Sequence, residues 1–387
     1  NLEEAGRHLL FLRPRRFGKS LLLSMLENYY DVGRQAEFEA IFGGLAIGKE
    51  PTPLHNRYFI LKWDFSCVNP RGGVERIERS LFNHVNASIE AFARRYSGFL
   101  EDEITVTYED PFISWKSLLS VVSQTPYKLY LLIDEYDNFA NEVMMGAYGQ
   151  YATYRDLVQQ DGPMKTLFKG VKAATAGEGL ERIFITGVSP IVMSDITSGY
   201  NIAKDIHFDP VFHDLCGFTE GEIETTLEEI VQESGVQKER VGEALSMMRS
   251  YYNGYRFAPE RAEKVYNPTL ALYFFDQVVR QGRYPRKMLD ANLAPDETKL
   301  EYLGRAASGR QAILDLVQRN DPLEVTEIVD RFKLEEMLES NEQDNEFIGS
   351  FLYYFGMLTQ GEESGNPLKL PLVIPNLVIR GLYVERI

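Results

Sequence analysis

The 387-residue sequence predicts an α/β fold in which helices cover both faces of a parallel β-sheet. Short apolar segments of strand length alternate with longer segments of helical periodicity, which is the pattern that such sheets require. Two of the apolar segments also end abruptly in residues suited to phosphate and metal chemistry. In parallel sheets ligands bind beyond the carboxyl ends of the strands, so both segments point to one edge of the sheet.

The first of these segments, residues 8–12, leads into Gly18-Lys19-Ser20 and then into a helix that starts near Leu21. A loop that turns into a helix N-terminus aims backbone N–H groups at an anion. In a P-loop (Walker A) site the lysine contacts the β- and γ-phosphates and the serine hydroxyl binds Mg²⁺. The predicted nucleotide-binding residues are Arg13, Pro14, Arg15, Arg16, Phe17, Gly18, Lys19, Ser20 and Leu21. The motif is incomplete, because the first glycine of G-x-x-x-x-G-K-[ST] falls at Arg13, and the alternative is a plain strand-to-helix turn with a surface lysine.

The second segment, residues 128–133, ends in Asp134 and Glu135 and resembles a Walker B strand. We expect Asp134 to bind Mg²⁺ together with Ser20. Glu135 can position and deprotonate the attacking water. The alternative is a strand that reaches solvent at an acidic turn. The phosphate-loop motif and this acidic strand end occur in the order that P-loop proteins require, which favours the Walker B interpretation over that alternative.

A third strand, residues 182–187, ends in small polar residues. Thr186 and Ser189 lie where a side chain could sense the γ-phosphate or orient its water. An ordinary strand exit explains the same pattern equally well.

Together these motifs resemble the AAA-ATPase-like family of predicted ATPases. The matching segments are residues 13–20, 134–141, 186–190, 197–202, 252–257, 265–268 and 374–376. In that family Arg-Pro-Arg-Arg-Phe-Gly-Lys is the usual form of the loop, so Arg13 is a family trait. Members often carry a PD-(D/E)xK nuclease-like domain after the ATPase part, which implies a nuclease-like partner or domain beyond residue 387.

The resemblance and the helical patterning together predict three domains. Residues 1–215 form the P-loop NTPase core, an αβα sandwich, and residues 216–282 form a helical lid that opens with a capping-box spacing at Thr219 and Glu222. Residues 283–387 are expected to form a winged-helix-like module. Arg256 in the lid is the candidate for a second sensor of the phosphates, and a surface stacking role is the alternative. We read residues 144–162 as a loop near the site.

The charge balance argues against one class of function, the non-specific binding of nucleic acid. The net charge is −16, from 41 basic and 57 acidic residues, although a local basic patch is still possible. Two cysteines, Cys67 and Cys216, fit a reducing, cytoplasmic compartment, and we expect both thiols to be buried. No apolar run is long enough to span a bilayer. The histidines and acids of residues 207–216 match no standard zinc pattern and are expected to form a turn.

The sequence therefore predicts a Mg²⁺-dependent ATPase whose cycle acts as a conformational switch, with ATP and Mg²⁺ as ligands. Its catalytic candidates are Lys19, Glu135, Thr186 and Arg256. A second subunit could supply an arginine finger, as in AAA-type homo-oligomers. The alternative is a scaffold that binds nucleotide without turnover. Direct nucleic-acid processing is disfavoured, because Asp134 lies in no larger cluster of metal-binding carboxylates.

Overall fold

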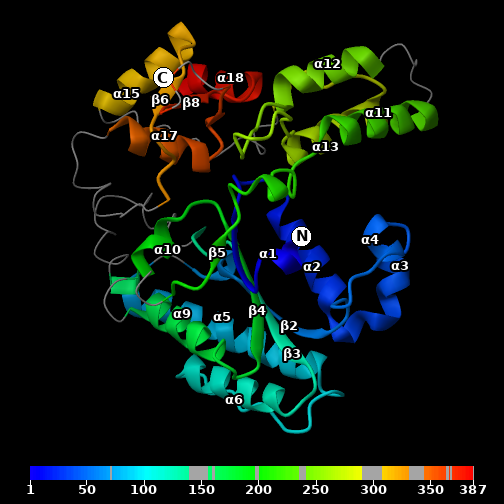
Figure 1. Cartoon of the computed structure of the whole chain (residues 1–387), viewed down its shortest axis with the longest axis vertical. Helices are drawn as coiled ribbons and strands as arrows, with labels where there is room; N and C mark the ends of the chain where they lie inside the picture. Colours follow the sequence, from blue (N-terminus) through cyan, green and yellow to red (C-terminus); the bar gives the residue numbers. More distant parts are fainter. Residues whose placement is uncertain are drawn as a thin grey trace. The chain divides into compact units, whose positions relative to one another are not determined.

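The computed structural model describes residues 1–69, 72–138, 156–158, 162–196, 200–234, 241–289, 307–330, 344–362, 366 and 368–386. These residues form two compact units (Figure 1). Unit 1 contains residues 1–11 and 19–206, and unit 2 contains residues 12–18 and 207–387. The loop that precedes Lys19 therefore belongs to unit 2. The finer division into core, lid and C-terminal module stays a prediction.

Unit 1 is an α/β unit whose strands are separated by helices. Its elements are α1 (Leu2–Ala5), β1 (His8–Leu12, whose last residue belongs to unit 2), α2 (Lys19–Tyr30), η1 (Val32–Glu37), α3 (Phe38–Phe42), α4 (Ala46–Lys49), β2 (Tyr58–Asp64), η2 (Phe65–Cys67), α5 (Val74–Arg95), α6 (Pro111–Ser123), β3 (Lys128–Asp134), α9 (Pro163–Ala174), β4 (Leu180–Gly187), α10 (Ile191–Ile196) and β5 (Lys204–Asp205). The predicted strands at residues 8–12, 128–134 and 182–187 are confirmed. The predicted loop over residues 144–162 lies almost entirely outside the described residues.

The five strands form one sheet in the order β2-β3-β4-β1-β5. The pairs β2–β3, β3–β4 and β1–β5 are parallel, and the register places Asp64 opposite Asp134. Strand β4 lies between β3 and β1, so its carboxyl end is next to the acidic end of β3. Residues of the central strands are buried along their length, as expected for a sheet covered on both faces.

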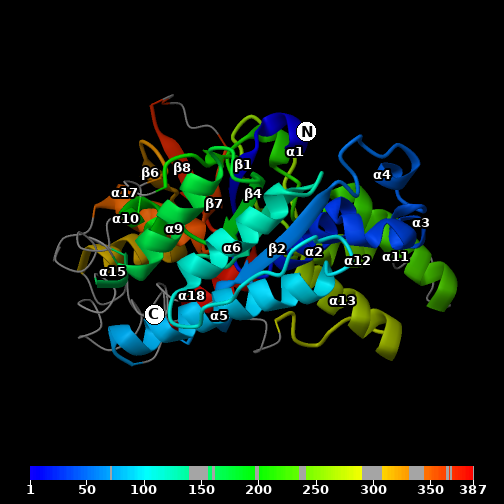
Figure 2. The ribbon, with the colours of Figure 1, turned by 90° about the horizontal axis from the view of Figure 1, so that it is seen from below.

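Alternate residues of the strands face different helices. Tyr58 and Tyr130, on one face, pack with Tyr30 of α2, with ring centroids 6.0 and 5.3 Å from it. Phe59, on the other face, packs against Phe92 and Tyr96 at the end of α5. Helices α5, α6 and α9 lie side by side on that second face (Figure 2). The prediction of a parallel sheet with helices on both faces is therefore confirmed.

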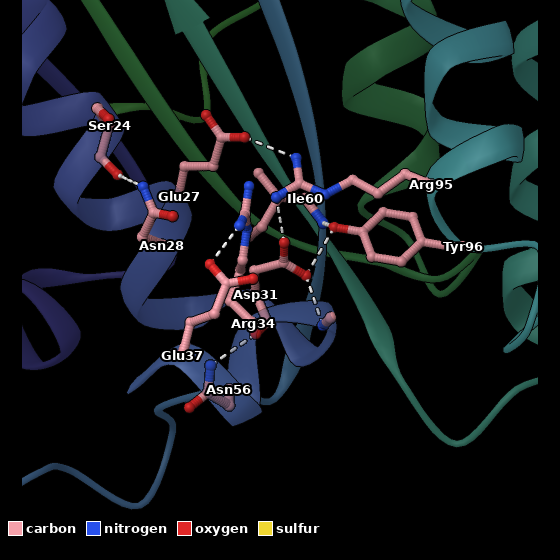
Figure 3. Close-up of polar contacts among 11 residues, drawn as sticks. Ser24, Glu27, Asn28, Asp31, Arg34, Glu37, Asn56, Ile60, Arg95 and Tyr96 are labelled. Carbon is pink, nitrogen blue, oxygen red and sulfur yellow. Dashed lines mark hydrogen bonds and ion pairs between the residues drawn. The ribbon is translucent and has the colours of Figure 1, made fainter. Parts of the chain in front are cut away.

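A buried carboxylate fixes the C-terminal end of α2 (Figure 3). Asp31 is fully buried, and its Oδ1 accepts hydrogen bonds from the Tyr96 hydroxyl at 2.8 Å and the Gly33 N–H at 2.7 Å. Arg95 forms an ion pair with Asp31 and a second one, of 2.6 Å, with Glu27. These partners come from α2, from α5 and from the turn after α2. The network therefore connects the C-terminal end of α2, the helix that begins at Lys19, to the C-terminal end of α5.

Unit 2 consists of η3 (Pro210–Phe212), α11 (Glu220–Ser234), α12 (Val241–Tyr252), α13 (Pro268–Gln281), α15 (Ala307–Leu314), the π-helical turn η6 (Asp315–Arg319), β6 (Leu323–Val325), α17 (Asn345–Tyr354), β7 (Thr359–Gln360), β8 (Leu370–Val373) and α18 (Leu377–Arg386). The three strands form an antiparallel sheet, β6-β8-β7. The predicted capping box is confirmed, since Thr219 and Glu222 exchange hydrogen bonds before α11. Whether the strands and their helices constitute a winged helix stays a prediction.

The two cysteines differ in exposure, which corrects the expectation that both are buried. Cys216 is buried, but Cys67 is exposed, because it lies in the short turn that follows β2 and not within the strand. No helix in the described ranges is both long enough and apolar enough to cross a membrane.

Candidate functional site

Asp134 lies at the carboxyl end of β3 and is 1 % exposed. Its Oδ1 accepts a hydrogen bond of 2.7 Å from the Thr186 hydroxyl and one of 3.0 Å from the Glu135 N–H. Within the described part of the chain its Oδ2 accepts no hydrogen bond. A buried carboxylate with one oxygen held and the other available suits a hard cation or its bound water. Asp134 and Thr186, both predicted from sequence, are therefore brought together.

Glu135 directly follows Asp134 and has a φ of 47°, in the left-handed region that few residues other than glycine adopt. This conformation turns the chain sharply at the end of β3, and the Glu135 side chain is only partly buried. Such unusual backbone conformations tend to persist where surrounding contacts fix them and function uses them. The role of Glu135 as a base is not tested by this geometry and stays a prediction.

A second buried carboxylate, which sequence reasoning left without a role, joins the ends of β3 and β4. Asp137 is 1 % exposed and accepts hydrogen bonds from the N–H groups of Val188 and Ser189 at 3.1 and 2.8 Å. The Ser189 hydroxyl adds a third, of 3.0 Å. The Tyr136 hydroxyl donates to the Ser189 carbonyl at 2.6 Å. Ser189 therefore fixes the turn after β4. The sequence feature that could have indicated a role for Asp137 is its position three residues after Asp134.

Lys19 and Ser20 begin α2, where the helix dipole favours a negative charge. Lys19 is 5 % exposed, whereas Ser20 is exposed and Leu21 is 66 % exposed. A lysine held at the start of a helix, beside the strand edge that carries Asp134, is suited to bind phosphate oxygens. Phosphate binding by Lys19 stays a prediction.

The Arg13 side chain has a different environment from the one that phosphate contact requires. It is 2 % exposed, and its guanidinium donates to the carbonyl oxygens of Leu12, His207 and Phe212 at 2.8–2.9 Å. It also lies over the Phe257 ring, 4.0 Å from the centroid. These contacts occupy the guanidinium inside unit 2. Nucleotide binding by Arg13 stays a prediction.

The rest of the loop is packed within unit 2 as well. Phe17 makes edge-to-face contacts with Tyr255 and Phe257, with centroid distances of 4.8 and 5.4 Å. Arg16 and Gly18 have φ values of 68° and 84°, and the Arg16 carbonyl accepts a hydrogen bond of 2.8 Å from the Thr269 hydroxyl. The segment of residues 252–257, which lies far along the chain, therefore supplies the aromatic rings that pack against the loop. Arg15 is partly buried, and Pro14 is buried.

Arg256, the predicted second sensor, is 7 % exposed and donates to the Gly361 carbonyl. Its backbone N–H donates to the Thr359 hydroxyl at 2.7 Å. In this arrangement the guanidinium connects the segment of residues 253–257 to Gly361, which directly follows β7. The sensor role of Arg256 stays a prediction.

Buried histidines flank Arg13. Burial, followed by the nearby Arg13 charge, lowers the pKa of His207 to about 3 and that of His213 to about 4. Burial lowers the pKa of Arg13 itself to about 10, which still leaves it protonated at neutral pH. The segment predicted to be a turn therefore supplies carbonyl acceptors and neutral rings around one cation. Among the described residues, no group of three or more histidines, cysteines or acids is placed to hold a metal ion.

The family model described as "Predicted AAA-ATPase" matches residues 1–197, just over half of the chain. The chain belongs to the predicted AAA-ATPase family. The matched region contains Lys19, Asp134, Glu135 and Thr186, and it ends before Arg256.

Other similar proteins add a fold comparison. An uncharacterized protein from the vnfD 5′ region of Azotobacter chroococcum mcd 1 is 26 % identical over 283 residues, which cover 71 % of this chain and 46 % of that protein. The chain thus spans about half the length of this curated relative. The Walker-type ATPase of Pyrococcus abyssi has a TM-score of 0.50 at 15 % identity, covering 97 % of this chain and 90 % of its own. That likeness shows that the two chains share a fold. The ORC1 protein of Aeropyrum pernix in complex with DNA is more distant, with a TM-score of 0.36 at 12 % identity, covering 98 % and 86 % of the two chains.

In this AAA-ATPase family member, the predicted site residues that belong to unit 1 lie at the start of α2 and at the ends of β3 and β4. The oxygen donors there, the Ser20 hydroxyl and Asp134 Oδ2, are the types that Mg²⁺ prefers. The chemistry of this donor set therefore fits a nucleotide-bound magnesium ion.

Proposed function

We propose that this chain binds Mg²⁺–ATP and hydrolyses it, and that the nucleotide state acts as a conformational switch. The observation that carries the proposal is the buried Asp134 carboxylate, oriented by the Thr186 hydroxyl at 2.7 Å with its Oδ2 available. The family match and the parallel sheet support the same class of protein, an ATPase. Bound magnesium would neutralise charge on the β- and γ-phosphates.

Each of the remaining residues has one task in the proposed reaction. The Lys19 amine and backbone N–H groups of residues 15–19 bind phosphate oxygens. Glu135 accepts a proton from the attacking water. Thr186 holds Asp134 in one rotamer, so that the acid needs no reorganisation when charge develops. Arg256 is proposed to contact the phosphates from unit 2 in one state of the cycle.

The proposed output of the switch is control of a nuclease-like domain, attached or in a partner. Support comes from the resemblance to a family in which such domains often follow the ATPase part. The helical lid, the winged-helix-like module and an arginine finger from a second copy belong to the same proposal.

Equilibrium binding of a fluorescent ATP analogue tests the nucleotide part directly. We expect saturable binding in the presence of Mg²⁺, weaker binding with EDTA, and loss of binding for Lys19→Ala. The control is Lys165→Ala, a partly buried lysine in the first turn of α9, away from the predicted motif. Equal binding by Lys19→Ala and the parent chain would reject the proposal. Binding without turnover in any condition would leave the scaffold alternative.

A further inference from the structure

A polar pocket of about 490 Å³ in unit 1 is separate from the proposed nucleotide site. One wall comes from α5, where Arg76, Arg79 and Asn83 follow one another at helical spacing on the same face. The other wall comes from residues that follow β2, including Cys67 and Asn69. The volume falls in the range of small-molecule sites, about 300–1,000 Å³.

The lining is cationic in a chain that is strongly acidic. Its described lining residues include Arg76 and Arg79 and no carboxylate, although acids outnumber bases by 57 to 41 in the sequence. Over the described ranges neither of these arginines forms an ion pair, whereas Arg94 on the same helix pairs with Glu90. Two guanidinium groups one turn apart, without a protein anion, are suited to bind one multiply charged group.

The two walls are held together by hydrogen bonds to the backbone. His84 Nε2 accepts from the Asp64 N–H at 3.1 Å, and the Ser80 hydroxyl accepts from the Asn69 N–H at 2.9 Å. Because Nε2 is the acceptor, a neutral His84 ring carries its proton on Nδ1, which is a donor. The pocket therefore presents donors on a frame that is already formed.

The position of β2 separates the pocket from the phosphate loop. β2 is the edge strand, and β1, which leads into Lys19, is the third strand from it. At about 4.8 Å per strand the two ends are roughly 14 Å apart. Asp64, which contacts His84, pairs in register with Asp134, so the pocket frame is one strand away from the predicted metal-binding acid.

We propose that this pocket, formed by Arg76, Arg79, Asn83 and the turn after β2, binds a small phosphorylated ligand distinct from the hydrolysed nucleotide. A phosphate monoester carries more charge than a carboxylate and uses both guanidinium groups. A long polyanion is a poorer candidate, because the net charge of −16 repels an extended phosphate backbone.

Cys67 provides a direct readout, because it is exposed in the pocket lining while Cys216 is buried. The experiment measures the rate of Cys67 alkylation by iodoacetamide, with inorganic tripolyphosphate as the probe. The Lys19→Ala chain without Mg²⁺ is used throughout, so that the phosphate loop does not contribute. Calorimetric titration with the same probe gives the affinity independently of the thiol.

We expect saturable protection of Cys67, and an affinity about tenfold weaker in Arg76→Gln and in Arg79→Gln, because each variant loses a charge-assisted hydrogen bond; tenfold corresponds to about 1.4 kcal/mol. Arg94→Gln is the matched control, an exposed arginine of α5 outside the pocket, and should leave the affinity unchanged. All three positions are exposed, so the variants should keep the melting temperature of the parent. Equal protection in all variants would overturn the proposal. So would stronger protection by a single-stranded oligonucleotide at the same phosphate concentration, because the ligand would then be a nucleic acid.

Discussion

The Thr186 hydroxyl donates a hydrogen bond of 2.7 Å to Asp134 Oδ1, across the boundary between β4 and β3. Both residues are buried; Asp134 is the last residue of β3 and Thr186 is the penultimate residue of β4. The bond exists because β4 lies between β1 and β3 in the sheet, which brings a threonine next to the acidic strand end. It makes Thr186 a positioning residue for Asp134.

Thr186→Val should test this relationship, since valine keeps the shape and removes the hydroxyl. We expect ATP turnover to fall about tenfold to a hundredfold, as for loss of one preorganised group, while the affinity for ATP changes little. Thr186→Ser restores the donor and should recover most of the turnover rate. The measurement is steady-state phosphate release as a function of ATP concentration. If Val and Ser variants behave alike, the hydroxyl has no such role.

Arg13→Gly would restore the glycine that phosphate loops usually carry, and we expect it to destabilise unit 2. Three buried carbonyl oxygens would lose a charged donor and Phe257 would lose its cation, which together cost about 3–4 kcal/mol. Chemical denaturation measures the loss. Arg280→Gln, which removes an exposed i,i+4 pair with Asp276, should cost less than about 0.5 kcal/mol. A stable Arg13→Gly protein with weakened ATP binding would instead show that the Arg13 side chain contacts phosphate.

Gly187→Ala should disturb the join between β3 and β4. A Cβ atom at Gly187 would lie 2.5 Å from Asp137 Oδ1 and from the Tyr136 ring. Because Asp137 is held by three donors, we expect a loss of about 2–3 kcal/mol of stability, typical of an overpacked site. Gly381→Ala on α18, where no atom lies within 4 Å of the added Cβ, should not destabilise the protein. Equal melting temperatures for both variants would contradict the described packing.

His207 should make the stability pH-dependent. Its pKa in the folded protein is about 3, below the ordinary value of 6.5, so the unfolded chain binds the additional proton as the pH falls. The stabilising contribution is complete above pH 6.5 and decreases below it, by about 1.4 kcal/mol at pH 5.5. Denaturation curves at pH 7.5 and 5.5 measure this change. His207→Gln should reduce the slope, and an unchanged slope would assign the pH dependence to other groups.

Much of unit 1 could be predicted from sequence because its signals are local. Strand-length apolar runs gave β1, β3 and β4, and a carboxylate at a strand end indicated Asp134. The sequence placed Thr186 near the end of a strand but could not show that it contacts Asp134. That contact depends on the order of the strands in the sheet, which is set by long-range pairing that no local pattern encodes.

The role of Arg13 could not be predicted, because its partners are backbone carbonyls of residues 194 and 199 positions away. Carbonyl acceptors leave no mark in the sequence, and the charge pattern of the loop favoured phosphate. Asp137 was missed for a related reason: its donors are N–H groups of the turn after β4. Cys67 was expected to be buried because free thiols usually are, but it lies in the short turn after β2 and is exposed.

Phosphate release from Mg²⁺–ATP by the parent chain, Lys19→Ala and Glu135→Gln is the decisive test of ATP hydrolysis at the site around Asp134. We expect turnover by the parent, no turnover and no ATP binding by Lys19→Ala, and ATP binding without turnover by Glu135→Gln. Turnover by Glu135→Gln at the parent rate would contradict this expectation.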